Sequence, residues 1–84
     1  MFYVYVLKSM KDNKLYIGFT HDLAKRINEH NQGESTATKN RRPFKLVYYE
    51  AYMSIKDAHT REVRLKKFKK SYAELKKRIE HSLT

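Results

Sequence analysis

The sequence contains no cysteine, no tryptophan and no long apolar run. Without cysteine the chain cannot form a disulfide scaffold, a thiolate metal site or a cysteine nucleophile, and this absence fits a reducing compartment. A membrane span needs ~20 consecutive apolar residues, so no membrane partner is expected. The first residues lack the basic start and the small-residue cleavage site of a signal peptide. We therefore expect a cytoplasmic protein.

The chain is also short, with 84 residues. A chain of this length buries only roughly two-thirds of its unfolded surface, which leaves no room for a second domain or a large cofactor domain. Its apolar content of 40% is typical of a folded domain and too high for a disordered basic tail. We expect one monomeric domain over residues 1–84.

Acidic residues are scarce: 9 Asp+Glu stand against 19 Lys+Arg, for a net charge of +10. Residues 1–35 carry a net charge of only +1, whereas residues 36–84 carry +9. Such a concentration of positive charge favours a polyanionic partner, with nucleic acid first, although a basic surface can also serve solubility alone. The residues expected to contact nucleic acid are Lys39, Arg41, Arg42, Arg61, Arg64, Lys66, Lys67, Lys69 and Lys70.

Apolar and aromatic runs predict three strands. They lie at about residues 2–7, 15–19 and 44–52, and the first two are close enough to form a hairpin. The third follows a long polar loop, whose Pro43 cannot join a central strand ladder.

Capping patterns predict three helices. One covers residues 22–31 and is stopped by Gly33, while two capping boxes begin at Ser54 and Ser71. The second helix ends at about 69 or 70 and the third at about 81. The order is β-β-α-β-α-α, which predicts an α+β fold with a small, mostly antiparallel sheet flanked by helices.

Glu62 is an unusual residue in the second predicted helix. Helical geometry places it between Ala58 and Leu65, on or beside an apolar stripe that also includes Ile55 and Phe68. A carboxylate there loses hydration, which is costly unless a cation or a hydrogen-bond donor compensates. Glu62 can therefore pair with a neighbouring Arg or Lys, turn towards solvent, or belong to a site.

Tyrosine is abundant, with seven residues against four phenylalanines. Tyrosine suits half-buried strands, so the core alone can explain them. Each buried hydroxyl nevertheless needs a partner. Arg26 and His30 are four residues apart and share one helix face. Tyrosines near this pair and Glu62 would form a polar pocket.

The order and spacing of these residues resemble the GIY-YIG nuclease superfamily over essentially the whole chain. Tyr16-Ile17-Gly18 matches the second signature triplet, while Tyr3-Val4-Tyr5 keeps the tyrosine of the first but not its glycine. The chain is most similar to small stand-alone bacterial members, which are related to the N-terminal nuclease domain found in the excinuclease ABC system.

The resemblance implies an endonuclease that uses one divalent ion, Mg²⁺ or Mn²⁺, to hydrolyse phosphodiester bonds of DNA, with structure specificity and a repair role. The roles it implies are water or phosphate positioning for Tyr5, general base or water orientation for Tyr16, phosphate stabilisation for Arg26, a proton relay for His30, metal binding for Glu62 and close backbone approach for Gly18.

One departure concerns an asparagine that many members carry after the metal-binding glutamate. No asparagine follows Glu62 here, although Ser71, Tyr72 or a lysine among residues 66–70 could substitute. The endonuclease hypothesis therefore competes with a nucleic-acid-binding module that has lost turnover, and with a basic structural or protein-interaction domain whose tyrosines are core. The small site favours a protein partner or a structure-specific substrate as the source of specificity.

Overall fold

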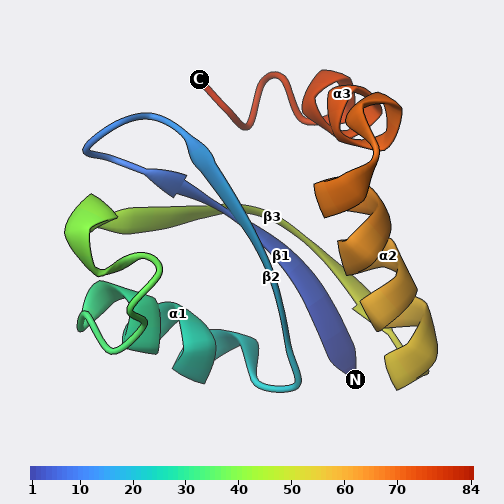
Figure 1. Ribbon diagram of the computed structural model, residues 1–84, viewed down its shortest axis with the longest axis horizontal. Coiled ribbons are helices and arrows are strands. Elements are labelled where there is room, and N and C mark those ends of the chain that lie inside the picture. The colour runs from blue at the N-terminus through green and yellow to red at the C-terminus, as the bar shows by residue number, and fades with distance from the viewer.

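A three-stranded antiparallel sheet forms the middle of the computed structural model, which describes residues 1–84 (Figure 1). The central strand is β1, in the order β2-β1-β3. The elements along the chain are β1 (Phe2–Ser9), β2 (Leu15–Thr20), α1 (Leu23–Asn31), a 3₁₀ turn (Lys39–Arg41), β3 (Phe44–Tyr52), α2 (Ile55–Lys67) and α3 (Lys69–Arg78). The predicted α+β fold and its order are confirmed. No helix combines the length and apolar character that crossing a bilayer requires.

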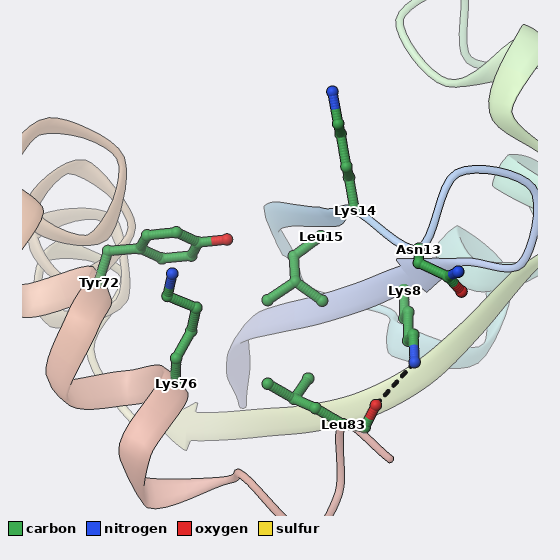
Figure 2. Close-up of a pocket in the computed structure, with 7 residues that line it drawn as sticks. All are labelled: Lys8, Asn13, Lys14, Leu15, Tyr72, Lys76 and Leu83. Carbon is green, nitrogen blue, oxygen red and sulfur yellow. Dashed lines mark hydrogen bonds between the residues drawn. The ribbon is translucent and has the colours of Figure 1, made fainter.

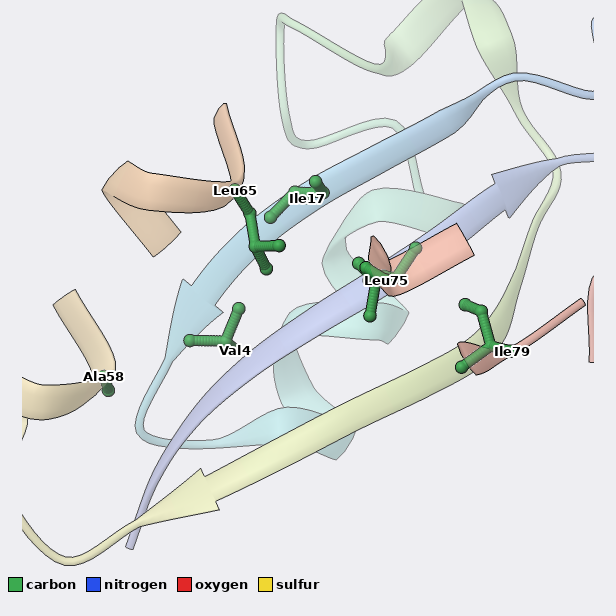
Figure 3. Close-up of a cluster of buried hydrophobic side chains, with 7 residues drawn as sticks. Val4, Ile17, Ala58, Leu65, Leu75 and Ile79 are labelled. Atoms are coloured by element: carbon green, nitrogen blue, oxygen red, sulfur yellow. The ribbon is translucent and has the colours of Figure 1, made fainter. Parts of the chain in front are cut away.

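Strand β1 separates two apolar clusters because successive side chains point to opposite faces. Val4 and Val6 pack with residues of α2 and α3, among them Leu65 and Leu75 (Figure 3). Tyr5 lies in the other cluster, with Leu23 and Ile27 of α1 packed against it. The interpretation of the first strand as buried on both faces is confirmed, and one helix covers one face while two cover the other.

The boundary between α2 and α3 differs from the prediction. Phe68 has an extended backbone, with φ −111° and ψ 115°, so α2 ends at Lys67 and α3 begins at Lys69. The predicted helix start at Ser71 is wrong, since Ser71 lies within α3, which ends at Arg78 rather than near 81. The break at Phe68 lets α3 turn its own apolar face, with Leu75, into the core that Leu65 also enters.

The apolar stripe of α2 is narrower than predicted. Ala58 and Leu65 are buried, but Ile55 and Phe68 are 52% and 53% exposed. Ile55 is the first residue of α2 and Phe68 follows its last, so the buried stripe is confined to the middle of the helix. Ser54 holds the expected N-cap position, although its side chain makes no capping hydrogen bond.

A carboxylate network joins β3 to α2. The hydroxyl of Tyr48 donates to Glu50 Oε2 at 2.7 Å, and Tyr52 donates to Oε1. Arg61 of α2 grips the same carboxylate through Nε and Nη2, at 2.9 and 3.0 Å. Burial by itself would raise the pKa of Glu50, but the hydrogen bonds from Arg61, Tyr52 and Tyr48 outweigh it and hold the pKa below its ordinary value.

We expect this network to make stability depend on acid pH. Because the folded pKa of Glu50 is depressed, its contribution is complete above the unfolded value of 4.5 and is lost as pH falls through the folded value. Glu50→Gln should cost about 1–2 kcal/mol at pH 7 and flatten the pH dependence. Urea unfolding at pH 7, 4.5 and 3 measures both effects.

The matched control is Glu74→Gln, which removes an exposed carboxylate of α3 that makes no ion pair. It should unfold like the wild type at each pH. An unchanged pH slope in Glu50→Gln would contradict the role assigned to the network.

Candidate active site

The site begins with a close approach between neighbouring strands. Tyr5 of β1 stands directly opposite Gly18 of β2, so both lie on the same face of the sheet. A Cβ at Gly18 would lie 2.2 Å from the Tyr5 hydroxyl oxygen and 2.3 Å from Cζ. The phenol of Tyr5 can therefore cross β2 only because residue 18 has no side chain.

A chain of buried hydrogen bonds runs from this phenol. The Tyr5 hydroxyl lies 2.8 Å from Nε2 of His30, and His30 Nδ1 lies 2.7 Å from Oγ1 of Thr38. Burial lowers the pKa of His30, and the charge of Arg26 lowers it further. The ring is therefore neutral at pH 7, with one donor and one acceptor nitrogen. Its two hydroxyl partners thus play opposite roles, as in a proton relay.

Burial also sets the state of Tyr5. It raises the pKa of the phenol to about 12, despite the opposing effect of the Arg26 guanidinium. Tyr5 thus remains protonated at neutral pH and acts as a hydrogen-bond donor or acceptor. It cannot serve as a general base there.

Thr38 is a site residue that the sequence analysis missed. It lies in the polar stretch between α1 and β3, where it is fully buried although its neighbours Ala37 and Lys39 are exposed. The stretch turns inward there, just before the 3₁₀ turn. A usable signal was chemical: a buried histidine needs a partner on each ring nitrogen, and a nearby Ser or Thr can supply one.

Tyr16 lies next to this chain. Its ring meets that of His30 at a centroid distance of 5.1 Å in an edge-to-face contact. The hydroxyl of Tyr16 has no partner within the chain, and since no buried polar side-chain atom lacks one, this hydroxyl reaches solvent. Tyr16 therefore offers a free phenol beside a buried chain of hydrogen bonds.

Glu62 comes from α2 on the β2 side of the sheet. Its side chain is 16% exposed, and Lys66 Nζ donates to its Oε2 at 3.0 Å. The same ammonium lies 5.9 Å from the ring centre of Tyr16. The charge of Glu62 also contributes to the raised pKa of Tyr5. Pairing with a lysine, one of the alternatives from the sequence, thus occurs beside the tyrosines.

Arg26 of α1 completes the cluster. Its guanidinium lies 3.2 Å from Glu29 Oε1, and its side chain remains 33% exposed. Its charge acts on the pKa of both Tyr5 and His30, so it lies close to both. Arg26 keeps donors for a phosphate that approaches from solvent, because a single carboxylate does not use all five of its N–H groups.

The donor set for a metal is small. No group of three or more His, Asp or Glu side chains converges anywhere in the structure. Mg²⁺ commonly keeps several waters and takes only one or two carboxylates. Glu62 fits that demand, because its nearest partner is the half-exposed Lys66, a flexible cation that can move aside.

The predicted nucleic-acid contacts fall into two groups. Three arginines are held within the fold: Arg61 by Glu50, Arg41 by Asp12 at 2.9 Å, and Arg42 by the Lys39 carbonyl at 2.9 Å. Lys66 pairs with Glu62. The remaining cations have exposed side chains without an ion pair and are Lys39, Arg64, Lys67, Lys69 and Lys70.

The residues that could substitute for the missing asparagine also fall into two groups. Tyr72 and Lys66 line a hollow of about 260 Å³ together with Tyr16. Ser71 does not line it. The structure therefore brings Tyr72 and Lys66, but not Ser71, into the same hollow as Tyr16.

Known proteins resemble this chain over most of its length. A family model described as the GIY-YIG catalytic domain matches residues 1–78. The chain is 47% identical over 68 residues to a UPF0213 protein of Clostridium perfringens, covering 80% of this chain and 72% of that one. It is 39% identical over 74 residues to the UPF0213 protein YazA of Bacillus subtilis, covering 87% and 74%.

Among solved structures, the chain is similar to the solution NMR structure of a UPF0213 protein from Bacillus halodurans. The TM-score is 0.55 at 35% identity, and the match covers 89% of this chain and 81% of that one.

Gly18→Ala should disrupt the site from within the sheet. The new methyl would overlap the phenol of Tyr5, which must move and leave His30. Overpacking of this kind costs about 1–3 kcal/mol. Unfolding measurements test the cost, and NMR signals of the His30 ring report the lost partner. Tyr5→Phe is the control, since it deletes the hydrogen bond alone and should cost about 1 kcal/mol. A Gly18→Ala protein with an unchanged His30 ring would contradict the account.

Proposed function

Because the chain belongs to the GIY-YIG family, we propose that it is a divalent-metal-dependent endonuclease that hydrolyses phosphodiester bonds of DNA. The observation that carries the proposal is the meeting of five side chains from four elements. They are Tyr5 of β1, Tyr16 of β2, Arg26 and His30 of α1, and Glu62 of α2. We further propose that the substrate is branched or nicked, and that the protein acts in DNA repair.

The cations of the site bind the scissile phosphate. Arg26 donates from one side, and Lys66 approaches from α2 once it leaves Glu62. Hydrolysis needs charge stabilisation on the phosphoryl oxygens, and the Arg26 guanidinium and the released Lys66 ammonium would provide it. Their placement on two different helices brackets the phosphate at the β2 edge.

The tyrosines have different tasks in this proposal. Tyr16 holds the attacking water, because its hydroxyl reaches solvent and has no other partner. Tyr5 is protonated at neutral pH and buried, so it acts through its hydrogen bond with His30 rather than by touching the phosphate. The neutral His30, bonded to Tyr5 and Thr38, holds the Tyr5 hydroxyl in place without adding a buried charge.

Glu62 would hold the divalent ion. When bound, such an ion polarises the phosphate and stabilises the leaving oxygen. An ion held by Glu62 would compete with the ion pair to Lys66, and the freed Lys66 ammonium would then be available to the phosphate.

Glu62→Gln is expected to lower cleavage by about 100-fold or more, since the loss of one charge-stabilising group typically has that effect. The assay follows branched, nicked and plain DNA with Mg²⁺ or Mn²⁺. Glu74→Gln, an exposed glutamate on α3, is the matched control and should cleave normally. Cleavage by Glu62→Gln equal to that of the wild type, or no cleavage by the wild type, would overturn the nuclease proposal.

The second candidate function is a nucleic-acid-binding module that has lost turnover. The Lys66–Glu62 pair and the absence of an asparagine after Glu62 favour it. This protein would bind DNA in a salt-dependent manner and leave it intact under every metal condition.

Both candidates share a prediction about the unpaired cations. Removing Lys67 and Lys70 together, as Lys67→Gln/Lys70→Gln, should reduce the slope of log K against log salt by about 0.9 per lost phosphate contact. Affinity should fall equally for different sequences. Titrations by fluorescence anisotropy from 50 to about 200 mM salt measure the slope. Salt-independent binding would leave only the third hypothesis, a structural domain.

A further inference from the structure

A second basic hollow lies away from the catalytic cluster, between the β1–β2 hairpin and α3. Its volume is about 450 Å³. Figure 2 shows Tyr72 and Lys76 of α3 facing Leu15, with Lys8 beside the chain near Leu83 and Lys14 extending outward from the hairpin. Three lysines but no carboxylate line the hollow.

The walls combine two chemistries. Leu15, Leu83 and the ring of Tyr72 supply apolar surface, while Lys8, Lys14 and Lys76 supply positive charge. A ligand that satisfies both is a flat, weakly polar group that carries an anion. Nucleotides have this composition, and proteins bind single strands by the same combination of aromatic and basic side chains.

Two of the three lysines, Lys8 and Lys76, make contacts that fix their position at the rim of the hollow. Lys8 Nζ donates to the carbonyl of Leu83 at 2.6 Å, which fixes the chain after α3 as one wall. Lys76 Nζ lies 4.6 Å from the ring centre of Tyr72. The Lys76 ammonium thus covers one face of the Tyr72 ring, and a base stacks on that face when a bound phosphate draws the ammonium aside, whereas the exposed Lys14 is free to follow the backbone.

The hollow shares two wall residues with a smaller hollow at the proposed catalytic site. The smaller hollow beside Tyr16 shares Leu15 and Tyr72 with it, and its other wall includes Lys66. Lys66 in turn bonds to Glu62. A strand whose phosphate lies at Tyr16 thus has a basic and partly apolar path along the edge of β2.

We propose that this hollow binds an unpaired nucleotide next to the scissile phosphate, so that the protein recognises DNA with a single-stranded flank. The inference rests on the proposed function, because the single-stranded flank is part of the strand that the nuclease cuts. A base can enter the hollow only when it is unpaired, because a duplex keeps its bases stacked inside. The pocket therefore selects a strand end, flap or gap over continuous duplex.

The test measures binding separately from cleavage. The full chain is titrated with a short oligothymidylate without divalent metal, and backbone amides are followed by NMR. Shifts at Leu15, Tyr72 and Lys76 are expected. Tyr72→Leu keeps an apolar side chain but removes the ring, and should weaken binding about 5- to 150-fold, since stacking contributes about 1–3 kcal/mol per base.

A second pair of variants avoids the core, because Tyr72 also packs against it. Lys14→Gln/Lys76→Gln should lower affinity and reduce the salt slope by about 0.7 per lost contact on a single strand. Lys77→Gln is the matched control, since Lys77 follows Lys76 on α3 and is exposed but does not line the hollow. The affinity of Lys77→Gln for oligothymidylate should fall less than that of the double variant.

Several outcomes would overturn the inference. One is shifts confined to Tyr16 and Glu62, and another is equal binding of blunt duplex with the same dependence on Tyr72. Displacement by an acidic peptide as effective as oligothymidylate would assign the hollow to a protein partner instead.

The two experiments distinguish failure of the pocket proposal from failure of the nuclease proposal. Binding in the hollow without cleavage of any DNA supports the pocket and counts against the nuclease. Cleavage that depends on Glu62 but is indifferent to a single-stranded flank and to Tyr72 supports the nuclease and overturns the pocket.

Discussion

The arrangement of the candidate site depends on one contact, the phenol of Tyr5 lying across the backbone of Gly18. This contact turns the hydroxyl of a central strand residue towards His30, which Thr38 holds from the other side. The site is therefore anchored in the sheet itself rather than in a loop. Because both strands are tightly paired, the position of the hydroxyl has little freedom, which preorganises the polar groups around it.

The charge of the protein serves two purposes. Arg41 ties the loop before β3 to Asp12 of the first hairpin turn, and Arg42 folds back on its own loop. These arginines stabilise local structure, whereas Lys67 at the end of α2 and Lys69 and Lys70 at the start of α3 remain unpaired. Arginine suits the first purpose because its planar fork makes several directed hydrogen bonds, and a flexible lysine suits a mobile polyanion surface.

The sequence predicted the element order well because each strand has a strong apolar pattern and each boundary a local signal. The clustering of Tyr5 and His30 was also accessible, since a buried hydroxyl must find a partner. A break between two helices was predicted near residues 69–71, but its position at Phe68 was not accessible, because tertiary packing of Leu75 against the sheet decides where the chain bends. Thr38 was hidden for a similar reason, because burial of a polar loop residue depends on contacts distant in sequence. The grip of Arg61 on Glu50 likewise depends on how α2 docks, which its sequence alone does not define.

The ion pair between Arg61 and Glu50 has a geometric consequence for Glu62, the next residue of α2. Consecutive residues of an α-helix are rotated by about 100° around its axis. With Arg61 fastened to β3, the rotational phase of α2 is set, and Glu62 must then point about 100° further round, towards the β2 side. The Glu50 carboxylate takes no part in the proposed chemistry. By holding Arg61, it nevertheless fixes the rotation of α2 about its axis and so orients the Glu62 carboxylate towards the tyrosines.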